Sequence, residues 1–138
     1  MVKLIVGVKG TGKTKLLINM VNDALEKTNG SVVCVEKGSK LIHEVKYQAR
    51  LIDSDEFMIT DAHALFGFIS GICASNHDVT DVFVDGTLKI CQNNPDELVQ
   101  LIRSLMKLDK TLQVNFVLTV SMPVESIPEE YRELMIEH

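Results

Sequence analysis

The residues from Gly7 to Thr14, GVKGTGKT, have the types and spacing of a loop that wraps a phosphate group. They match the pattern G-x-x-x-x-G-K-[ST] in full. Glycine adopts positive φ angles at low cost and leaves no Cβ between a backbone N–H and an anion. A helix that begins at the loop adds the positive end of its dipole. The residues predicted to bind phosphate are Gly7, Val8, Lys9, Gly10, Thr11, Gly12, Lys13 and Thr14.

Two side chains at the end of this stretch could act on a bound polyphosphate. The Lys13 ammonium would contact the β- and γ-phosphates, and the Thr14 hydroxyl would be a ligand for Mg²⁺. The context supports this interpretation, because an apolar strand-like run precedes the glycines and a helix-like pattern follows them. The alternative is a glycine-rich turn that binds nothing.

Composition predicts one globular domain over residues 1–138. The net charge of -5 argues against broad nucleic-acid binding, and an aromatic content of 5% without interleaved basic residues offers no platform for stacking bases. The charge is uneven, however. Residues 1–50 carry nine Lys and Arg against four Asp and Glu, whereas residues 51–138 carry five against fifteen. A basic half that contains the glycine-rich stretch suits a small anionic ligand.

The N-terminus and the cysteines indicate a cytoplasmic protein. The first ten residues, MVKLIVGVKG, lack the apolar core and cleavage site of a signal peptide. Three cysteines without C-x-x-C spacing favour neither a disulfide framework nor a zinc site. The apolar stretch AHALFGFISGICA is too short to span a bilayer, so no membrane association is expected. We interpret it as a buried or interface-facing helix whose Gly67 and Gly71 allow close packing on a sheet.

Hydrophobic periodicity in the first half of the chain predicts strands at Val2–Val6 and Ser31–Glu36, with a helix at Lys13–Lys27 between them. The Ser31–Glu36 run, SVVCVE, is continuously apolar up to its last residue, which is typical of a strand buried on both faces. The mixed, basic residues 37–50 favour a short helix, and Arg50–Asp53 is a candidate third strand.

The second half of the chain continues the alternation. Thr60 or Asp61 can cap a helix that runs to about Ala74. An Asn-Pro-Asp-Glu start at Asn94 begins another helix, with Glu97 three residues after the cap. Strands are expected at Asp81–Asp85 and Gln113–Val120, and Ser126 with Glu129 can cap a short C-terminal helix. The order predicts an α/β fold, a three-layer αβα sandwich around a mostly parallel five-stranded sheet.

Gly7 to Thr14, together with the strand-terminal Asp85 of VFVD, resembles the two signatures of the P-loop nucleoside triphosphatases. The strand order along the chain resembles the RecA-like (ASCE) division, in which an extra strand lies between the loop strand and the aspartate strand. The resemblance implies that Asp85 holds Mg²⁺ through water opposite Thr14. GTPase signatures are missing after Asp85, which favours ATP as the nucleoside triphosphate.

The residue after the aspartate departs from this family. Many RecA-like proteins carry a catalytic Glu there, whereas this chain has Gly86. A subset carries the water-activating Glu at the end of the strand after the loop helix, which is the position of Glu36, so Glu36 is the candidate general base. The alternative is an exposed Glu36 paired with Lys37 or Lys40. Thr119 and Ser121 are candidate sensors of the γ-phosphate or ordinary strand-end hydroxyls.

Three functions follow from these residues. The first is an Mg-ATP-binding protein that hydrolyses ATP slowly, with Lys13 and Glu36 as catalytic residues, and acts as a switch or assembly factor. The second is a small nucleoside or metabolite kinase, although a zinc-bearing or arginine-rich lid is missing. The third is a nucleotide-binding module without hydrolysis. The resemblance also implies that a second copy of the chain or a protein partner can complete the site, and Arg50, Arg103 and Arg132 are the only arginines available as a finger.

Overall fold

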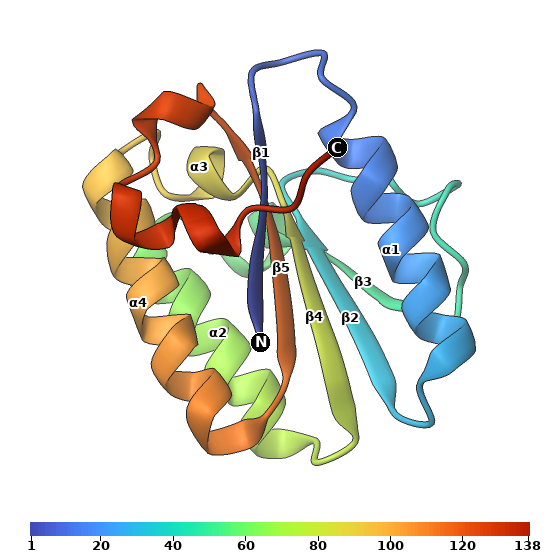
Figure 1. Cartoon of the computed structure of the whole chain (residues 1–138). Coiled ribbons are helices and arrows are strands. Elements are labelled where there is room, and N and C mark those ends of the chain that lie inside the picture. Colours follow the sequence, from blue (N-terminus) through green and yellow to red (C-terminus); the bar gives the residue numbers. More distant parts are fainter.

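The computed structural model describes all residues from 1 to 138 and has the expected α/β architecture (Figure 1). Five strands alternate with helices along the chain. The strands are β1 (Val2–Gly7), β2 (Ser31–Glu36), β3 (Arg50–Asp53), β4 (Val79–Asp85) and β5 (Asn115–Ser121). The α-helices are α1 (Lys13–Lys27), α2 (Ala62–Ser75), α3 (Thr87–Ile90) and α4 (Pro95–Leu112), and the 3₁₀ helices are η1 (Ser54–Phe57), η2 (Val124–Ser126) and η3 (Glu129–Leu134).

The five strands form one sheet in the order β1-β5-β4-β2-β3, and every neighbouring pair is parallel. The sheet is therefore entirely, rather than mostly, parallel. The strand that separates β1 from β4 is β5, the last one along the chain. Because parallel strands share one direction, the ends of β1, β2 and β4 bring Gly7, Glu36 and Asp85 to the same edge of the sheet.

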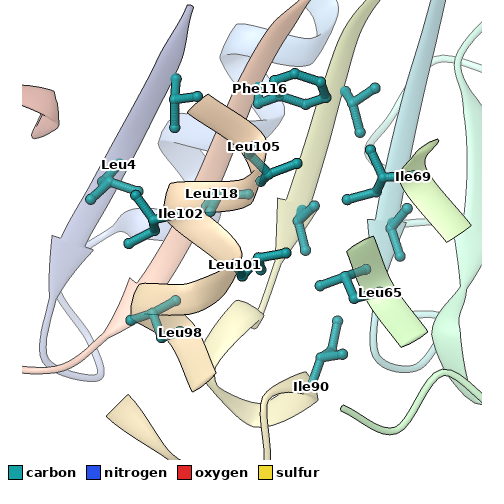
Figure 2. Packing of buried hydrophobic residues seen from close by; sticks show 14 of the residues in the cluster. Leu4, Leu65, Ile69, Ile90, Leu98, Leu101, Ile102, Leu105, Phe116 and Leu118 are labelled. Carbon is teal, nitrogen blue, oxygen red and sulfur yellow. The ribbon is translucent and has the colours of Figure 1, made fainter. Parts of the chain in front are cut away.

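The sheet carries helices on both faces, as a three-layer sandwich requires. Figure 1 shows α1 on one side and α2 and α4 on the other. The α2/α4 face buries a cluster of 27 residues. Figure 2 shows members of this cluster, among them Leu101, Leu105 and Phe116, packed between α4, α2 and the sheet. The α1 face buries 11 residues. Strands covered on both faces must be apolar at successive positions, and β2 is buried from Val32 to Glu36.

Local capping signals begin two of the helices as expected. The Asn94 side chain accepts a hydrogen bond from the Asp96 N–H at the start of α4, and the Asp61 side chain accepts one from the Ala64 N–H at the start of α2. Glu97 has a different role from the one its spacing suggests. Its Oε1 accepts from the Ala62 N–H at 3.1 Å, so it caps the neighbouring helix and ties α4 to α2.

One expected helix is absent, and another is a 3₁₀ helix with a different cap. Residues 37–49 form turns, because Leu41, Val45 and Ala49 turn inward to extend the α1-side core and no continuous helical hydrogen bonding links them. The short C-terminal helix is the 3₁₀ helix η3, which follows η2. Pro128 and Pro123 occupy their N-cap positions, and the Ser126 side chain caps neither helix. The short helix α3 was not expected.

The glycines of α2 do not allow close packing. Gly67 and Gly71 are on the exposed side of the helix, where an added Cβ would meet nothing within 4 Å. The helix instead packs through Leu65, Ile69 and Cys73. None of the helices combines the length and the hydropathy needed to cross a bilayer.

The open edge of β1 is partly covered by the C-terminal residues. Met135 forms a parallel bridge with Leu4, and the Ile136 N–H donates to the Leu4 carbonyl at 2.8 Å. The His138 Nε2 lies 3.0 Å from the Val6 carbonyl. Residues 135–138 therefore run beside β1 toward the loop that follows it, as Figure 1 shows.

Candidate functional site

The glycine loop, residues Gly7–Thr14, connects the end of β1 to the start of α1 at the edge of the sheet. Gly10 and Gly12 have φ values of 88° and 82°, the left-handed region that the sequence pattern anticipated for glycine. The backbone N–H groups from Gly10 to Lys15 have no hydrogen-bond partner within the protein. They are free to bind an anion where the positive end of the α1 dipole lies.

The Lys13 side chain folds back over this loop. Its Nζ donates to the Val8 carbonyl at 3.0 Å, and only 7% of the residue is exposed. Burial lowers the pKa of Lys13 from its ordinary value, and the nearby Asp85 carboxylate opposes that shift. A single carbonyl satisfies only one of the three ammonium protons. The remaining donors can therefore bind phosphate oxygens without any change in the fold.

Thr14 and Asp85 are 71 residues apart in sequence and adjacent in the fold. The Thr14 hydroxyl lies 3.3 Å from Asp85 Oδ1 and 3.4 Å from Oδ2. Thr119 holds the same carboxylate from β5: its hydroxyl donates to Asp85 Oδ1 at 2.7 Å and accepts from the Gly86 N–H at 2.9 Å. Thr119 thus fixes the Asp85 side chain and the turn into α3.

The oxygen atoms of Thr14 and Asp85 fit Mg²⁺. This cation prefers hard oxygen ligands and keeps several waters, so one hydroxyl and one carboxylate suffice when phosphate oxygens supply other positions. The protein has no cluster of three or more His, Cys, Asp or Glu side chains that could hold a metal alone. A cation here would therefore depend on the phosphate it accompanies.

Glu36 lies beside Asp85 but is covered. The two are register partners on β2 and β4, and Glu36 is only 2% exposed, so the exposed Glu considered from the sequence is not found. Its Oε1 accepts from the Leu41 N–H at 2.9 Å, and Lys37 forms its ion pair with Asp55. Burial raises the pKa of Glu36, opposed by the Leu41 hydrogen bond.

A cleft of about 380 Å³ opens at the glycine loop. Its charged lining consists of the five lysines Lys9, Lys13, Lys15, Lys40 and Lys89 and one carboxylate, Asp85. None of these lysines forms a salt bridge. Thr119 and Ser121 also line the cleft, whereas Glu36 does not. The positive charge is suited to a polyphosphate with more than one negative charge.

The three arginines lie away from this cleft. Arg50 is the first residue of β3, the edge strand farthest from β1. Arg103 lies on α4. Arg132 donates to the carbonyls of Ile127 and Glu125. The structure therefore presents lysine, and no arginine of the same chain, to a bound phosphate.

Comparison with known proteins finds no family model that matches the chain and no curated protein that matches its sequence. The site therefore rests on its own geometry.

Of the predicted site residues, Lys9, Gly10, Gly12, Lys13, Thr14 and Asp85 line the cleft, whereas Gly7, Val8, Thr11 and Glu36 do not. Residues of the glycine loop, including Lys13 and Thr14, meet Asp85 in one cleft, while Glu36 stays beneath its wall. Sequence reasoning missed Lys40 and Lys89 as cleft residues, which approach from the turns after β2 and from α3. The basic excess of residues 1–50 was the available signal for Lys40; nothing in the sequence singled out Lys89.

Proposed function

We propose that this protein binds Mg-ATP in the glycine-loop cleft, hydrolyses it slowly, and uses the bound nucleotide as a switch or assembly signal. The observation that carries the proposal is the meeting of Lys13, the Thr14 hydroxyl and the Asp85 carboxylate beside a loop of unpaired N–H groups. Phosphoryl-transfer sites work mainly by positioning and charge neutralisation. This arrangement offers both.

Each part of the chain has a role in this proposal. The N–H groups from Gly10 to Lys15 and the Lys13 ammonium bind the β- and γ-phosphates. Thr14 and Asp85 would hold Mg²⁺, which supplies positive charge to the phosphate oxygens when bound. Lys40 and Lys89 add positive charge from the other walls of the cleft. They take the place that an arginine was expected to fill.

Whether Glu36 can act as a general base decides between slow ATP hydrolysis and no hydrolysis. Its raised pKa makes the ionised carboxylate a stronger base than an ordinary Glu. The residue is only 2% exposed, however, and its Oε1 is held by the Leu41 N–H, so an attacking water has little access to the carboxylate. This limited access supports a slow rate. It also favours a second candidate function, a nucleotide-binding module in which Glu36 only holds the turn at Leu41. With either function, we expect the protein to act in the cytoplasm, where thiols stay reduced.

Calorimetry with Mg-ATP, run beside a phosphate-release assay, tests the proposal. Lys13→Ala should weaken Mg-ATP binding at least tenfold, about 1.4 kcal/mol. Lys37→Ala is the matched control, because Lys37 pairs with Asp55 outside the cleft. Absence of Mg-ATP binding in the wild type would refute the proposal.

The phosphate-release arm separates the remaining functions. Slow release that is abolished in Glu36→Gln would support hydrolysis with Glu36 as base. Binding without release would favour the non-hydrolysing module. Turnover that requires an added nucleoside or metabolite acceptor would instead indicate the kinase considered from the sequence.

A further inference from the structure

A second hollow, of about 770 Å³, lies on the other side of the glycine loop. It is enclosed by β1, the glycine loop, the η2 turn and the C-terminal residues that run beside β1. The loop itself separates it from the cleft: Val8 and Thr11 line the hollow, whereas Lys9, Gly10 and Gly12 line the cleft. A ligand bound by the loop could therefore extend from one into the other.

The two hollows differ in the charged residues that line them. The cleft has five lysines and a single apolar residue, Leu41. The lining of the second hollow is mixed, with six apolar residues and four charged or titratable ones. Its apolar residues are Val6, Val8, Pro123, Val124, Met135 and Ile136, and its charged or titratable ones are Glu125, Arg132, Glu137 and His138.

Two apolar side chains in the hollow are exposed to solvent. Val8 is 51% exposed and Val124 is 42% exposed, and they belong to the loop and to the facing η2 turn. Ligand sites are typically apolar with a few polar groups that fix orientation. Glu125 and Glu137 would repel phosphate and can accept hydrogen bonds from ribose hydroxyls or an exocyclic amino group. The charge difference between the two hollows orients a ligand that is anionic at one end and flat and apolar at the other.

We propose that this second hollow, lined by Val8, Val124 and Ile136, binds the nucleoside part of the nucleotide whose phosphates occupy the lysine-lined cleft. The inference rests on the proposed function and adds the specificity that the cleft lacks. The heterocycle packs against Val8 and Val124, and the ribose lies across the glycine loop. The C-terminal residues 135–138 thereby become part of the ligand site.

The test compares Mg-ATP with Mg-tripolyphosphate by calorimetry on the whole chain. Tripolyphosphate carries more negative charge than ATP, so the lysines alone would favour it. The wild type should bind Mg-ATP at least tenfold more tightly. Val124→Asn should weaken Mg-ATP binding three- to tenfold and change tripolyphosphate binding less than twofold, while Val124→Leu retains the wild-type affinity for both.

Leu112→Asn is the matched control. Leu112 is 41% exposed, close to the value for Val124, and it ends α4 at the opposite end of the sheet. The Leu112→Asn variant should leave the affinities for Mg-ATP and for Mg-tripolyphosphate unchanged. Equal affinity of the wild type for the two ligands, or an equal loss of both in Val124→Asn, would overturn the inference while leaving phosphate binding intact. Failure of both ligands to bind the wild type would instead overturn the proposed function, and this inference with it.

Discussion

The Thr119 hydroxyl ties the Asp85 carboxylate to β5. Thr119 is 2% exposed, and its single proton is used on Asp85 Oδ1 while its oxygen accepts from the Gly86 N–H. A hydroxyl in this position satisfies two part-buried polar groups at once. Its loss would leave the Gly86 N–H without a partner and release the Asp85 side chain from β5.

Thr119→Val should therefore lower the free energy of unfolding by about 1–3 kcal/mol, because the shape is kept and both hydrogen bonds are lost. Thr119→Val should also weaken ATP binding more in magnesium-containing buffer than in magnesium-free buffer. Urea unfolding and calorimetry measure the two effects. Thr119→Ser keeps the hydroxyl and should restore most of the magnesium dependence. A Thr119→Val protein as stable as the wild type would contradict this role.

Glu36 makes stability depend on pH in the direction opposite to most carboxylates. Burial, Asp85 and Asp53 raise its pKa in the folded protein, whereas the unfolded chain keeps a pKa near 4.5. The folded state therefore holds the proton more tightly, and stability declines as pH rises from about 4.5 to the raised folded pKa. Above that folded pKa the covered carboxylate is ionised, and the stabilisation that its proton gave at low pH is lost.

Glu36→Gln removes this charge and keeps an oxygen that can accept from the Leu41 N–H. We expect its free energy of unfolding, relative to the wild type, to increase between pH 4 and pH 8. Urea unfolding across that range is the measurement. Glu44→Gln, at an exposed position, should give a flat difference. A difference that decreases between pH 4 and pH 8 would show that the ionised carboxylate is favoured in the fold.

At the scale of elements, α2 and α4 begin where short-range hydrogen bonds are available. Asn94 and Asp61 accept from N–H groups two and three residues ahead. Glu97, in contrast, bonds across to the first turn of α2. Caps that need only neighbouring residues are readable from sequence, whereas a cap supplied by another helix depends on how the two helices pack.

Asn94→Ala should lower the free energy of unfolding by about 1 kcal/mol, since α4 loses the acceptor for the Asp96 N–H. Thermal or urea unfolding measures the change. Asn94→Asp retains an acceptor and should be close to the wild type. Gln100→Ala, at an exposed position inside the same helix, is the control and should change stability little. An equal loss in Gln100→Ala would mean that the cap is not the cause.

At the scale of the molecule, the sheet is covered unequally, with 27 buried residues on the α2/α4 face and 11 on the α1 face. Cys34 lies on β2 in the smaller cluster, and Cys91 follows α3 in the larger one. Both are fully buried, and burial raises the pKa of each thiol to about 12. The two thiols therefore report on the integrity of opposite faces.

We expect Cys34 and Cys91 to resist a thiol-specific disulfide reagent at pH 8 in the native protein, because the thiolate is both rare and covered. Cys73, which is 7% exposed, should react first. All three should react at once in concentrated urea. Cys73→Ser isolates the two buried thiols, and their labelling rates should then follow unfolding of the protein. Rapid labelling of either thiol in native buffer would show that its face opens locally.

Patterns confined to a few neighbouring residues determined much of this protein. The helix at Lys13–Lys27 and the strands at Ser31–Glu36 and Arg50–Asp53 have the predicted bounds. The positive φ angles of Gly10 and Gly12 also follow from residue type and spacing. Strand β4 begins two residues earlier than predicted, because residues next to a strand join it when a neighbouring strand offers hydrogen bonds.

Only the tertiary structure decided how distant residues meet. It joined Thr14 to Asp85, covered Glu36 with Leu41 and brought Lys89 to the cleft. These contacts depend on the sheet order β1-β5-β4-β2-β3 and on turns without a periodic pattern, such as residues 37–49. Residue type and spacing predict the geometry of a loop or a helix cap, because the residues that form it are adjacent in the chain. They do not predict the geometry of a site whose walls come from separate strands, because long-range packing sets the distances between those strands and their side chains.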